Sequence, residues 1–513
     1  MSPVSPDAFP GYRSIADIPH LQARERGAKA AIHTAAGSMS YAELDERCLG
    51  FAGFIAARAG AGARVGILLP NVPEFAVAYF GAIAAGAVAV PINYRLSPPE
   101  IGYIVSDCRP AVLVTTRAQL EKLAPLAEAR GVTTWVIVDG EGGVAIPFGA
   151  TLEGDALVEP VAVAPDDVAV LLYTSGTTGF PKGAMLSHAN TLFNARSCRL
   201  TLGYRRDDVG LVSLPLFHVT GLNSQLVALL ACGATLVIQR EYDTRQLLEL
   251  VSAKRATALF LVPAIYKLIT LRDDLARYDL SSVRLAAYGG APMDPETIRA
   301  FRRILPLVEM HNCYGLTESS SLATVLPAEL VLSRAESVGL AVPGTEAQVR
   351  GKSGEVLPAG DAGELYLRGP NVVQGYFGAP DRTRQAFRDG WLATGDVARI
   401  DADGLVTILD RVKDMINRGG EKIYGLEVEN VLYAYPGIAE AAVFGVPHPV
   451  FGEVPAACVV AQEGASIDSE DVIAHCRSRL ADYKVPVSVR VVDRLPRNPG
   501  GKVLKKDLQR AWR

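Results

Sequence analysis

Residues 173–183, YTSGTTGFPKG, combine hydroxyl, glycine and lysine residues in a pattern that suits the binding of a polyphosphate. The hydroxyls donate hydrogen bonds, the glycines allow the backbone to approach phosphate oxygens closely, and Lys182 adds a cation on a flexible stem. An apolar run at residues 168–172 precedes them and predicts a buried strand. A short piece of this segment would be an ordinary turn, but the whole run predicts a phosphate-binding loop.

This loop differs from the P-loop of mononucleotide-binding proteins, because Lys182 is followed by Gly183 where that motif requires serine or threonine. It resembles instead the phosphate-binding signature of the adenylate-forming superfamily, which includes acyl-CoA and aryl-CoA synthetases, luciferase and the adenylation domains of peptide synthetases. The resemblance implies ATP, Mg²⁺ and coenzyme A as ligands. It also implies that the following residues bind ATP: Thr174, Ser175, Gly176, Thr177, Thr178, Gly179 and Lys182.

A second motif, HNCYGLTES at residues 311–319, lies at the separation from the loop that the superfamily shows. The resemblance implies that Tyr314 stacks on adenine, that Thr317 contacts the α-phosphate and that Glu318 binds Mg²⁺. Asn312 matches a position that meets the amino edge of adenine. Without the resemblance, this motif would be an ordinary strand and turn with a surface acid.

Three further segments match nucleotide-binding positions. YGGAPM, residues 288–293, predicts a strand that ends in two glycines and a proline, where backbone can flank a flat ring. The sequence WLATGDVA places Asp396 in a predicted turn, and DRVKDMI places Arg411 at a predicted domain boundary. The resemblance implies that Asp396 accepts hydrogen bonds from the ribose hydroxyls and that Arg411 assists it. It also implies that the other wall of the adenine pocket is formed by Gly290, Ala291 and Pro292.

The chain ends in LPRNPGGKVLKKDL, where Lys502 follows two glycines in a basic tail. A run of charge is usually a solvated terminus. The resemblance implies instead that Lys502 is the catalytic lysine, which bridges the acyl carboxylate and the α-phosphate. It also implies that Lys413 is a hinge and that Gly420, in NRGGEKI, lines the channel for pantetheine after the small domain turns. One site would then run two half-reactions by presenting two faces of one domain.

The segment LPLFHVTGL, residues 214–222, matches the element beside the reacting carboxylate. His218 would position that carboxylate or gate the path of the thiol, and a purely structural histidine is the alternative. Malonate-activating members resemble PxxYxR, but PAIYKL puts Leu268 at the arginine position, which disfavours a dicarboxylate although Lys267 keeps it open. The other acyl-pocket candidates are uncharged and predict a neutral acyl tail: Thr220, Ser224, Gly289, Cys313 and Gly315.

Composition narrows the class of protein. A chain of 513 residues is too long for one core, and 49% hydrophobic with 21% charged residues is typical of a soluble globular enzyme. With a net charge of -4 and no concentration of basic residues outside the C-terminal tail, the sequence predicts no surface that binds nucleic acid. Seven cysteines without a CxxC pair indicate reduced thiols and a cytoplasmic location, and seven histidines without HExxH spacing disfavour a structural transition metal.

No targeting or membrane-spanning segment is expected. The N-terminus, MSPVSPDAFPGYRS, lacks the basic and apolar regions of a secretory signal. Residues 75–92 carry no charge over 18 positions, which is the length of a membrane span. However, Gly81 and Gly86 interrupt this stretch and it ends in AVAVPI, so we expect a buried helix followed by a buried strand.

Helix and strand signals alternate over residues 18–138 and again after the phosphate loop, which predicts mostly parallel sheets covered by helices. Ser40 is the expected cap of a helix that begins at Tyr41. Residues 139–167 are charged and rich in glycine, and they predict a surface connection. From Pro343 onward, short strands separated by glycine and aspartate predict a smaller antiparallel or barrel-like section.

We therefore predict an α/β protein with two domains. Residues 1–410 would form a large domain with two parallel-type α/β sheets and a small barrel-like section. Residues 411–513 would form a small mobile α+β domain with its hinge at Lys413.

The resemblance implies an ATP-dependent carboxylic acid–CoA ligase that forms an acyl-AMP and then transfers the acyl group to coenzyme A. An amine or a carrier-protein thiol as acceptor stays open, as does a light-emitting oxygenase on the same scaffold. A non-catalytic nucleotide-binding protein is disfavoured because Glu318 and Lys502 are present. The expected partner is a small carboxylic acid and not nucleic acid, and the oligomeric state stays open with a homodimer as one candidate.

Overall fold

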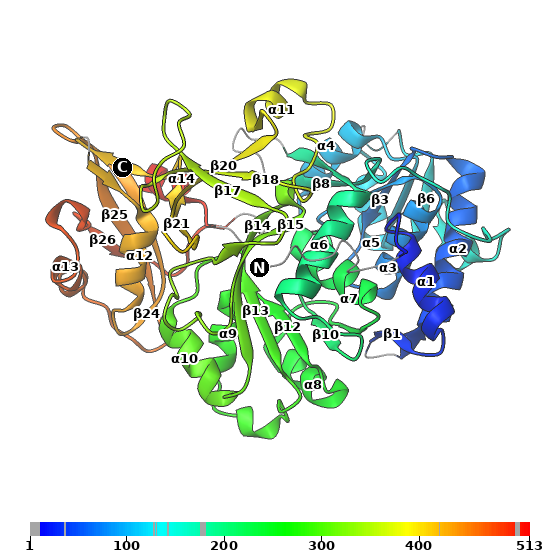
Figure 1. Cartoon of the computed structure of the whole chain (residues 1–513), viewed down its shortest axis with the longest axis horizontal. Helices are drawn as coiled ribbons and strands as arrows, with labels where there is room; N and C mark the ends of the chain where they lie inside the picture. Colours follow the sequence, from blue (N-terminus) through cyan, green and yellow to red (C-terminus); the bar gives the residue numbers. More distant parts are fainter. Residues whose placement is uncertain are drawn as a thin grey trace. The chain divides into compact units, whose positions relative to one another are not determined.

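Figure 1 shows the computed structural model, which describes residues 11–34, 37–126, 129, 131–140, 143–174, 181–419, 421–497 and 503–512. The chain divides into two compact units. Unit 1 comprises Met1–Ala347 and Leu367–Leu392, and unit 2 comprises Gln348–Tyr366 and Ala393–Arg513. Seven of the predicted site residues lie outside the described residues, and their roles stay predictions: Ser175, Gly176, Thr177, Thr178, Gly179, Gly420 and Lys502.

The first sheet of unit 1 has seven strands in the order β7-β6-β5-β3-β4-β8-β9. They are β3 (Arg64–Leu68), β4 (Val88–Pro91), β5 (Val112–Thr115), β6 (Thr134–Ile137), β7 (Ile146–Pro147), β8 (Val168–Thr174) and β9 (Lys182–Ser187). Neighbours are parallel except β8 and β9. Helix α2 (Tyr41–Arg58) precedes β3, and the helices between the strands are α3 (Pro73–Ala84), α4 (Pro98–Cys108) and α5 (Arg117–Leu123). The predicted alternation is confirmed, as is the strand before the phosphate loop.

Two local predictions in this region are confirmed. Helix α2 begins after Ser40 because its hydroxyl accepts the Glu43 amide at 3.2 Å and the Glu43 carboxylate accepts the Ser40 amide at 2.7 Å. Helix α3 and strand β4 divide the uncharged stretch into a buried helix and a buried strand. In the part of the chain that the structure describes, no helix combines the length and apolar character needed to cross a membrane.

The prediction of a surface connection over residues 139–167 is wrong in part. The 3₁₀ turn η2 (Gly149–Leu152) packs against α2, and Phe148 and Thr151 are buried. A Cβ atom at Gly53 of α2 would stand 1.9 Å from the Asp155 carbonyl oxygen, so glycine permits this close approach. Composition alone did not reveal the few apolar side chains that tie this segment to the core.

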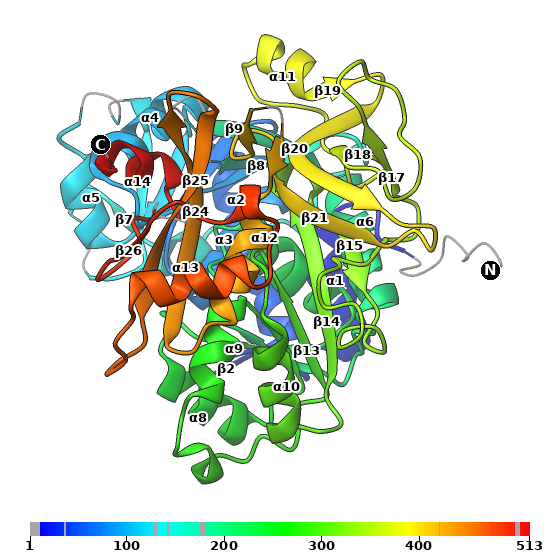
Figure 2. The same ribbon diagram turned by 90° about the vertical axis from the view of Figure 1, so that its left-hand side faces the viewer.

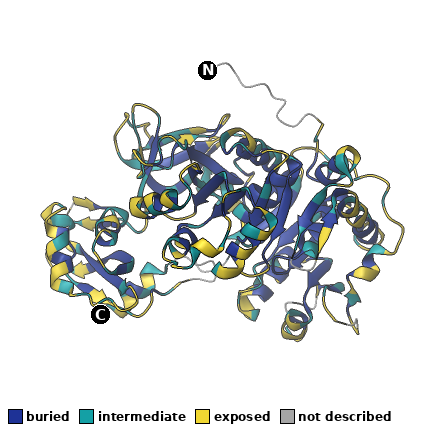
Figure 3. Ribbon diagram, turned by 90° about the horizontal axis from the view of Figure 1, so that it is seen from below, coloured by how far each residue is buried: buried dark blue, intermediate teal, exposed yellow. Residues whose placement is uncertain are grey.

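The second sheet of unit 1 has nine strands in the order β16-β15-β14-β13-β12-β10-β11-β1-β2. They are β1 (Ala30–His33), β2 (Ser38–Ser40), β10 (Val209–Val212), β11 (Thr235–Ile238), β12 (Ala258–Leu261), β13 (Leu285–Gly289), β14 (Glu309–Leu316), β15 (Ser321–Leu326) and β16 (Leu340–Ala341). The central pairs are parallel, and β14, β15 and β16 pair antiparallel. Most strands of both sheets are buried (Figure 3), as is expected when helices cover both faces.

Helices of unit 1 cover and join the two sheets. Helix α6 (His188–Thr201) packs against strands of both, β9 and β15, and lies between the sheets with α7 (Ala228–Ala231) (Figure 1). A π-helix, η3 (Thr220–Val227), leads directly into α7 and packs against β10 and β15. The remaining helices associated with the nine-stranded sheet are α1 (Asp17–Arg26), α8 (Thr244–Lys254), α9 (Pro263–Thr270) and α10 (Pro295–Ile304).

A third sheet contains the strands after Pro343, in the order β17-β18-β20-β19 with β21 beside β20. They are β17 (Glu346–Arg350), β18 (Gly363–Arg368), β19 (Phe387–Arg388), β20 (Trp391–Ile400) and β21 (Val406–Arg411), with α11 (Pro380–Ala386) before β19. The pairs β19–β20 and β20–β21 are antiparallel, as predicted. The predicted turn at Asp396 is wrong: Asp396 lies within β20 opposite Arg411. Gly395 resembles a turn signal and has φ of 71°, but its amide donates to Glu364 at 3.1 Å and the strand continues.

The rest of unit 2 is a sheet in the order β23-β22-β25-β24, with β26 beside β25. The strands are β22 (Ile416–Arg418), β23 (Glu421–Ile423), β24 (Ile438–His448), β25 (Gly452–Ala461) and β26 (Val489–Val491), of which β24 and β25 form a long antiparallel pair (Figure 2). The helices are α12 (Gly425–Tyr433), α13 (Ser469–Arg477) and α14 (Lys505–Ala511). Side chains of β24 alternate between two cores, Val443 with α12 and α13 and Phe444 with α14. The predicted α+β segment is confirmed.

Candidate active site

The predicted adenine-binding segments of unit 1 leave the nine-stranded sheet at one edge. Strands β13 and β14 are parallel neighbours with Gly289 opposite Cys313. Residues 290–292 and the end of β14 therefore lie next to each other at the carboxyl edge of the sheet. Gly290 has φ of 80°, and residues 290–292 are exposed. Ligands of open α/β sheets bind at this edge. The structure thus places the YGGAPM and HNCYGLTES motifs side by side.

A tight hairpin presents Thr317 and Glu318. Leu316 at the end of β14 pairs with Ser321 at the start of β15, and the 3₁₀ turn η5 (Thr317–Ser319) joins the strands. The side chain of Ser319 is buried, and its oxygen accepts the Leu316 amide at 2.9 Å. Both Thr317 and Glu318 remain half-buried. The hairpin therefore directs one hydroxyl and one carboxylate to the sheet edge.

Glu318 is held by Tyr376, a residue that the sequence interpretation missed. The Tyr376 hydroxyl donates to Glu318 Oε1 at 2.7 Å, and the Val373 amide donates to the Glu318 carbonyl at 3.0 Å. The Lys182 ammonium lies 4.9 Å from the centroid of the Tyr376 ring, which is a cation–π distance. One tyrosine thus joins the end of the phosphate loop to the predicted magnesium ligand.

The pairing of strand β9 explains where Tyr376 comes from. Ala184 of β9 forms an antiparallel bridge with Tyr376, and the Phe377 amide donates to the Gly183 carbonyl at 2.8 Å. Thr174 and Lys182 are opposite each other in the β8–β9 register, so they are the two paired ends of the predicted phosphate loop. A glycine-rich segment far along the chain therefore lies against the base of that loop.

The electrostatics of this cluster favour an anionic ligand. Burial lowers the pKa of the Lys182 amine, the Arg382 guanidinium lowers it further, and Glu318 opposes both effects. Burial and the Glu318 carboxylate raise the pKa of Tyr376, so its hydroxyl stays protonated and remains a donor. Two cations beside one carboxylate leave an excess of positive charge, and phosphate groups are the ligands that this charge attracts.

The protein itself orients Asn312, one of the residues predicted to contact adenine. Asn312 is buried in β14, and its side-chain amide donates to the Ser337 carbonyl at 2.8 Å, which sets the plane of the carboxamide. Tyr314 lies two residues further along the same strand and is half-buried. Because strand neighbours two apart face the same side, Asn312 and Tyr314 share one face of the sheet edge.

His218 lies between β10 and the π-helix and is uncharged at neutral pH. The surrounding protein lowers the pKa of His218 to about 4, and the nearby Arg95 guanidinium contributes, although the residue remains exposed to solvent. Aromatic rings lie beside His218, since its ring centroid lies 4.8 Å from that of Phe217 and Tyr94 meets Phe217 edge-on at 5.6 Å. An apolar surface with one neutral imidazole and one arginine suits a carboxylate with an apolar tail.

The other predicted acyl-pocket residues have close contacts within the protein. Ser224 has no exposed surface, and its hydroxyl donates to Ser321 at 2.7 Å. Cβ atoms at Gly289 and Gly315 would lie 2.3 Å from the Cys313 carbonyl oxygen and 1.4 Å from the Ser321 carbonyl oxygen. These two glycines thus allow close strand pairing, and the space of their missing side chains is filled by the chain itself. Thr220 is half-buried at the start of the π-helix. Their role in the acyl pocket stays a prediction.

The predicted ribose-binding pair belongs to unit 2. Arg411 Nε lies 2.7 Å from Asp396 Oδ1, and the Asp396 side chain is only 6% exposed. The pair bridges β20 and β21 at the register position where the two residues face each other. Lys413 follows in an exposed turn, closed by hydrogen bonds from the Asp414 and Met415 amides to the Arg411 carbonyl. The structure thus brings Asp396 and Arg411 together as predicted.

A magnesium ion fits the donor set at Glu318. Among the described residues, no group of three or more His, Cys, Asp or Glu side chains is arranged to hold a metal. Mg²⁺ in nucleotide sites needs only one or two carboxylates, because phosphate oxygens and waters supply its other ligands. Glu318 meets this requirement, since Tyr376 orients its carboxylate.

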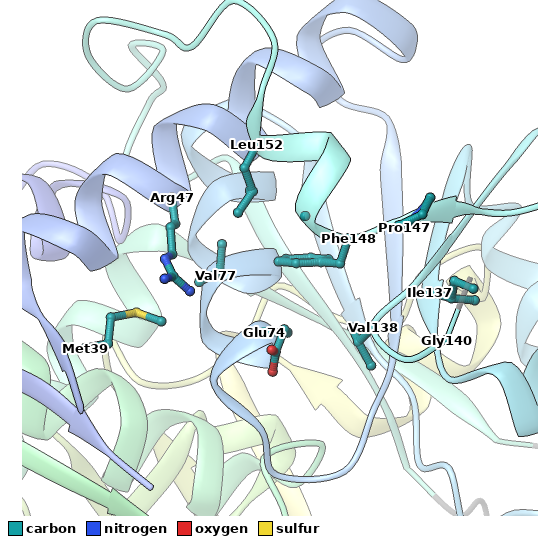
Figure 4. A pocket seen from close by; sticks show the side chains of 11 residues that line it. Met39, Arg47, Glu74, Val77, Ile137, Val138, Gly140, Pro147, Phe148 and Leu152 are labelled. Carbon is teal, nitrogen blue, oxygen red and sulfur yellow. The ribbon is translucent and has the colours of Figure 1, made fainter. Parts of the chain in front are cut away.

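A separate cavity of about 200 Å³ lies in unit 1 among α2, α3, β6 and η2 (Figure 4). Val77, Phe148 and Leu152 give it apolar walls, and Arg47 and Glu74 add charge. It adjoins β6 and β7, whereas the phosphate loop leaves β8 at the other side of the seven-stranded sheet. None of its lining residues is a predicted site residue, so this cavity is not the candidate active site.

Two family models match the chain: the AMP-binding enzyme family over residues 20–377 and the AMP-binding enzyme C-terminal domain over residues 427–502. Among curated proteins, a feruloyl-CoA synthase from Amycolatopsis sp is 39% identical over 496 residues, which are 96% of this chain and 98% of that protein. The long-chain-fatty-acid–CoA ligase FadD13 from Mycobacterium tuberculosis is 36% identical over 88% of each chain.

Solved structures show the same fold over nearly the whole length. The anthranilate CoA ligase AuaEII, in complex with anthranoyl-AMP, matches with a TM-score of 0.92 and 26% identity over 98% of both chains. The amide bond synthetase McbA from Marinactinospora thermotolerans matches with a TM-score of 0.89 and 28% identity over 97% of this chain and 99% of that chain. The predicted fold class is thereby confirmed.

Proposed function

We propose that the substrate of this protein is a hydrophobic monocarboxylic acid. The premise is that the chain belongs to the AMP-binding enzymes of the adenylate-forming superfamily and is an AMP-forming acid–thiol ligase. The acid reacts with ATP to give acyl-AMP and pyrophosphate, and the thiol of coenzyme A then displaces AMP. The cluster of Lys182, Tyr376 and Glu318 at the sheet edge is the observation that supports the adenylation step most directly.

In adenylation, a carboxylate oxygen attacks the α-phosphorus while the bond to pyrophosphate breaks. Because two anions must meet, positive charge has to be in place before the reaction. Lys182 and Arg382 provide that charge near the phosphates, and Thr317 donates a hydrogen bond to the α-phosphate. Mg²⁺, when bound, neutralises phosphate charge, and Glu318 would hold it through the carboxylate that Tyr376 orients. Tyr314 and residues 290–292 flank adenine, and Asn312 meets its amino edge.

We assign roles in both half-reactions, and the domain movement between them, to residues of the C-terminal part of the chain. Lys502 bridges the acyl carboxylate and the α-phosphate during adenylation. Asp396, oriented by Arg411, accepts hydrogen bonds from the ribose hydroxyls. The domain of residues 411–513 then turns at Lys413 and brings Gly420 to the path of the thiol.

The acyl group is proposed to lie beside His218. A neutral imidazole accepts or donates a hydrogen bond without adding charge, so the Arg95 guanidinium, which acts on His218, supplies the positive charge for the acyl carboxylate. The aromatic neighbours Phe217 and Tyr94 favour an apolar tail. Leu268 of α9, at the position of an arginine in malonate-activating enzymes, disfavours a second carboxylate. The names of the relatives support both aromatic and long-chain aliphatic acids, and both classes stay in the proposal.

An amine is the alternative acceptor, and a carrier-protein thiol is another. The similarity to an amide bond synthetase keeps the amine in consideration, because both kinds of enzyme share the adenylation step. The greater identity to CoA ligases favours coenzyme A. We also propose a cytoplasmic location, since all seven cysteines are free thiols.

The test is CoA-dependent release of AMP, with the acyl-CoA product identified by mass, across two panels of acids. One panel contains short, medium and long aliphatic acids, and the other contains substituted benzoates and cinnamates. A preferred acid that yields acyl-CoA supports the proposal and identifies the pocket class. Release of pyrophosphate without acyl-CoA in every case would contradict the CoA assignment and favour an amine or a carrier protein.

A further inference from the structure

The backbone immediately after Glu318 is held in a conformation that disfavours its residues. Ser320 has φ of 55° and Ser321 has φ of 103°, so two consecutive non-glycine residues have positive φ. The Cβ atom makes this region unfavourable for L-residues, and hairpin turns of this kind normally use glycine or asparagine. Such a conformation persists only where the surroundings enforce it, and it concentrates at functional sites.

Side chains of the π-helix provide that enforcement. The Asn223 amide donates to the Ser320 carbonyl at 3.1 Å, and the Ser224 hydroxyl donates to the Ser321 hydroxyl at 2.7 Å. Neither Asn223 nor Ser224 has any exposed surface. From α6, Asn194 supports the same point, because its side-chain oxygen accepts the Leu322 amide at 3.0 Å. Three consecutive residues, Ser320, Ser321 and Leu322, are thus tied to buried polar side chains.

The π-helix is a structural element well suited to this task. Its wider turn is rare and is found mostly at functional sites. The next residue, Gln225, is equally buried but donates elsewhere, to the Leu211 carbonyl at 2.9 Å and the Phe260 carbonyl at 3.2 Å. Asn223 and Ser224 are therefore distinguished from Gln225 by the hairpin that they contact, not by burial.

We infer that Asn223 and Ser224 are positioning residues: they hold Ser320 and Ser321 in the left-handed region and thereby keep Glu318 aimed at the nucleotide. This inference rests on the proposed function, because it assigns Glu318 to magnesium and ATP. The π-helix also begins two residues after His218, and the Leu222 amide donates to the His218 carbonyl at 2.9 Å. One element thus sets the positions of both the acyl side and the phosphate side of the site.

The experiment compares the Mg²⁺ dependence of acid-dependent ATP–pyrophosphate exchange in three proteins: wild type, Asn223→Ala and Gln225→Ala. Gln225→Ala is the matched control, since it removes an equally buried amide from the same helix. We expect Asn223→Ala to need about tenfold more Mg²⁺ for half-maximal exchange, or to lose about tenfold in rate at saturation, because small displacements of catalytic groups have effects of this size. The Mg²⁺ requirement of Gln225→Ala should stay close to that of wild type.

Rescue provides the second readout. Glycine adopts positive φ without the cost of a Cβ atom. Introducing Ser320→Gly into Asn223→Ala should therefore restore most of the lost Mg²⁺ affinity, even though it adds no contact, and it leaves the Ser224–Ser321 hydrogen bond in place. A purely structural role for Asn223 predicts lower thermal stability without a shift in Mg²⁺ dependence and without this rescue. If Asn223→Ala fails to fold, Ser224→Ala removes only one hydroxyl and tests the second contact of the π-helix with the hairpin, the hydrogen bond to Ser321.

The outcomes distinguish a failure of the proposed function from a failure of the positioning role of Asn223. If wild type shows no pyrophosphate exchange with any acid, the proposed function fails. If wild type exchanges and Asn223→Ala matches Gln225→Ala both in Mg²⁺ dependence and in rate at saturation, the positioning role is overturned while the proposed function stands.

Discussion

Replacing Tyr376 with phenylalanine is predicted to weaken adenylation by removing the hydroxyl that orients Glu318, while the ring next to Lys182 stays in place. The lost hydrogen bond is 2.7 Å long and its acceptor is a carboxylate. Hydrogen bonds to charged groups contribute about 1.5–3 kcal/mol. A loss of about 2 kcal/mol corresponds to about a thirtyfold change, since about 1.4 kcal/mol is a factor of ten. We expect this change in the rate of adenylation or in the Mg²⁺ concentration required.

The assay is ATP–pyrophosphate exchange with a preferred acid, measured over a range of Mg²⁺ concentrations. Tyr41→Phe is the matched control, because the Tyr41 hydroxyl is buried and donates to the Ala234 carbonyl at 2.6 Å without contact to a proposed site residue. Both variants should lose some stability against urea. Only Tyr376→Phe should change the Mg²⁺ dependence. Equal rates and equal Mg²⁺ requirements in the two variants would refute the role that we give to Tyr376.

Three further predictions concern the two half-reactions and pH. Lys502→Ala should reduce acyl-AMP formation by about 10²-fold or more and spare CoA transfer from supplied acyl-AMP. Equal loss of both steps would contradict the proposal that the small domain presents a different face in each half-reaction. Gly420→Leu should do the reverse, and a fully active variant would remove the channel assignment. Burial lowers the pKa of His188 from 6.5 to about 4, and its Nδ1 accepts a hydrogen bond from the Ile15 amide at 3.2 Å. The folded protein therefore stabilises the neutral imidazole of His188. This contribution is present above pH 6.5 and is lost as pH falls toward 4, because the unfolded chain takes up the proton first. Between pH 7 and 5 the free energy of unfolding should fall about 2 kcal/mol less in His188→Gln than in wild type, and identical pH slopes in urea unfolding would contradict the assignment.

Several features of the fold follow directly from short stretches of sequence. Ser40 and Glu43 form their capping box within one helical turn, so the start of α2 is a local property. The apolar runs of β3, β4 and β5 alternate with helical patterns, and parallel strands buried on both faces have this signature. The motifs around Lys182 and Glu318 were likewise recognisable, because each is a continuous segment with a resemblance to known enzymes.

Other features required the folded chain. Tyr376 lies 58 positions from Glu318, and nothing in its own segment, a glycine followed by an aromatic residue, distinguishes it from many others. The turn expected at Asp396 failed for a related reason, since a glycine–aspartate pair is a turn signal unless a neighbouring strand continues to pair with it, as β21 does. The charged, glycine-rich interval at residues 139–167 shows the same limit, because composition does not reveal which apolar side chains reach a core.

The sequence by itself determined the fold class, the family and the chemical groups of the candidate site, because periodicity, caps and motifs are properties of neighbouring residues. Only the tertiary structure decided which groups support them. Asn223 donates to Ser320 across 97 positions of the chain. The positive φ of the hairpin persists because tertiary packing holds the π-helix and the hairpin in place together. Contacts over such separations depend on how sheets and helices assemble, and that arrangement determines how Glu318 and Lys182 share one tyrosine.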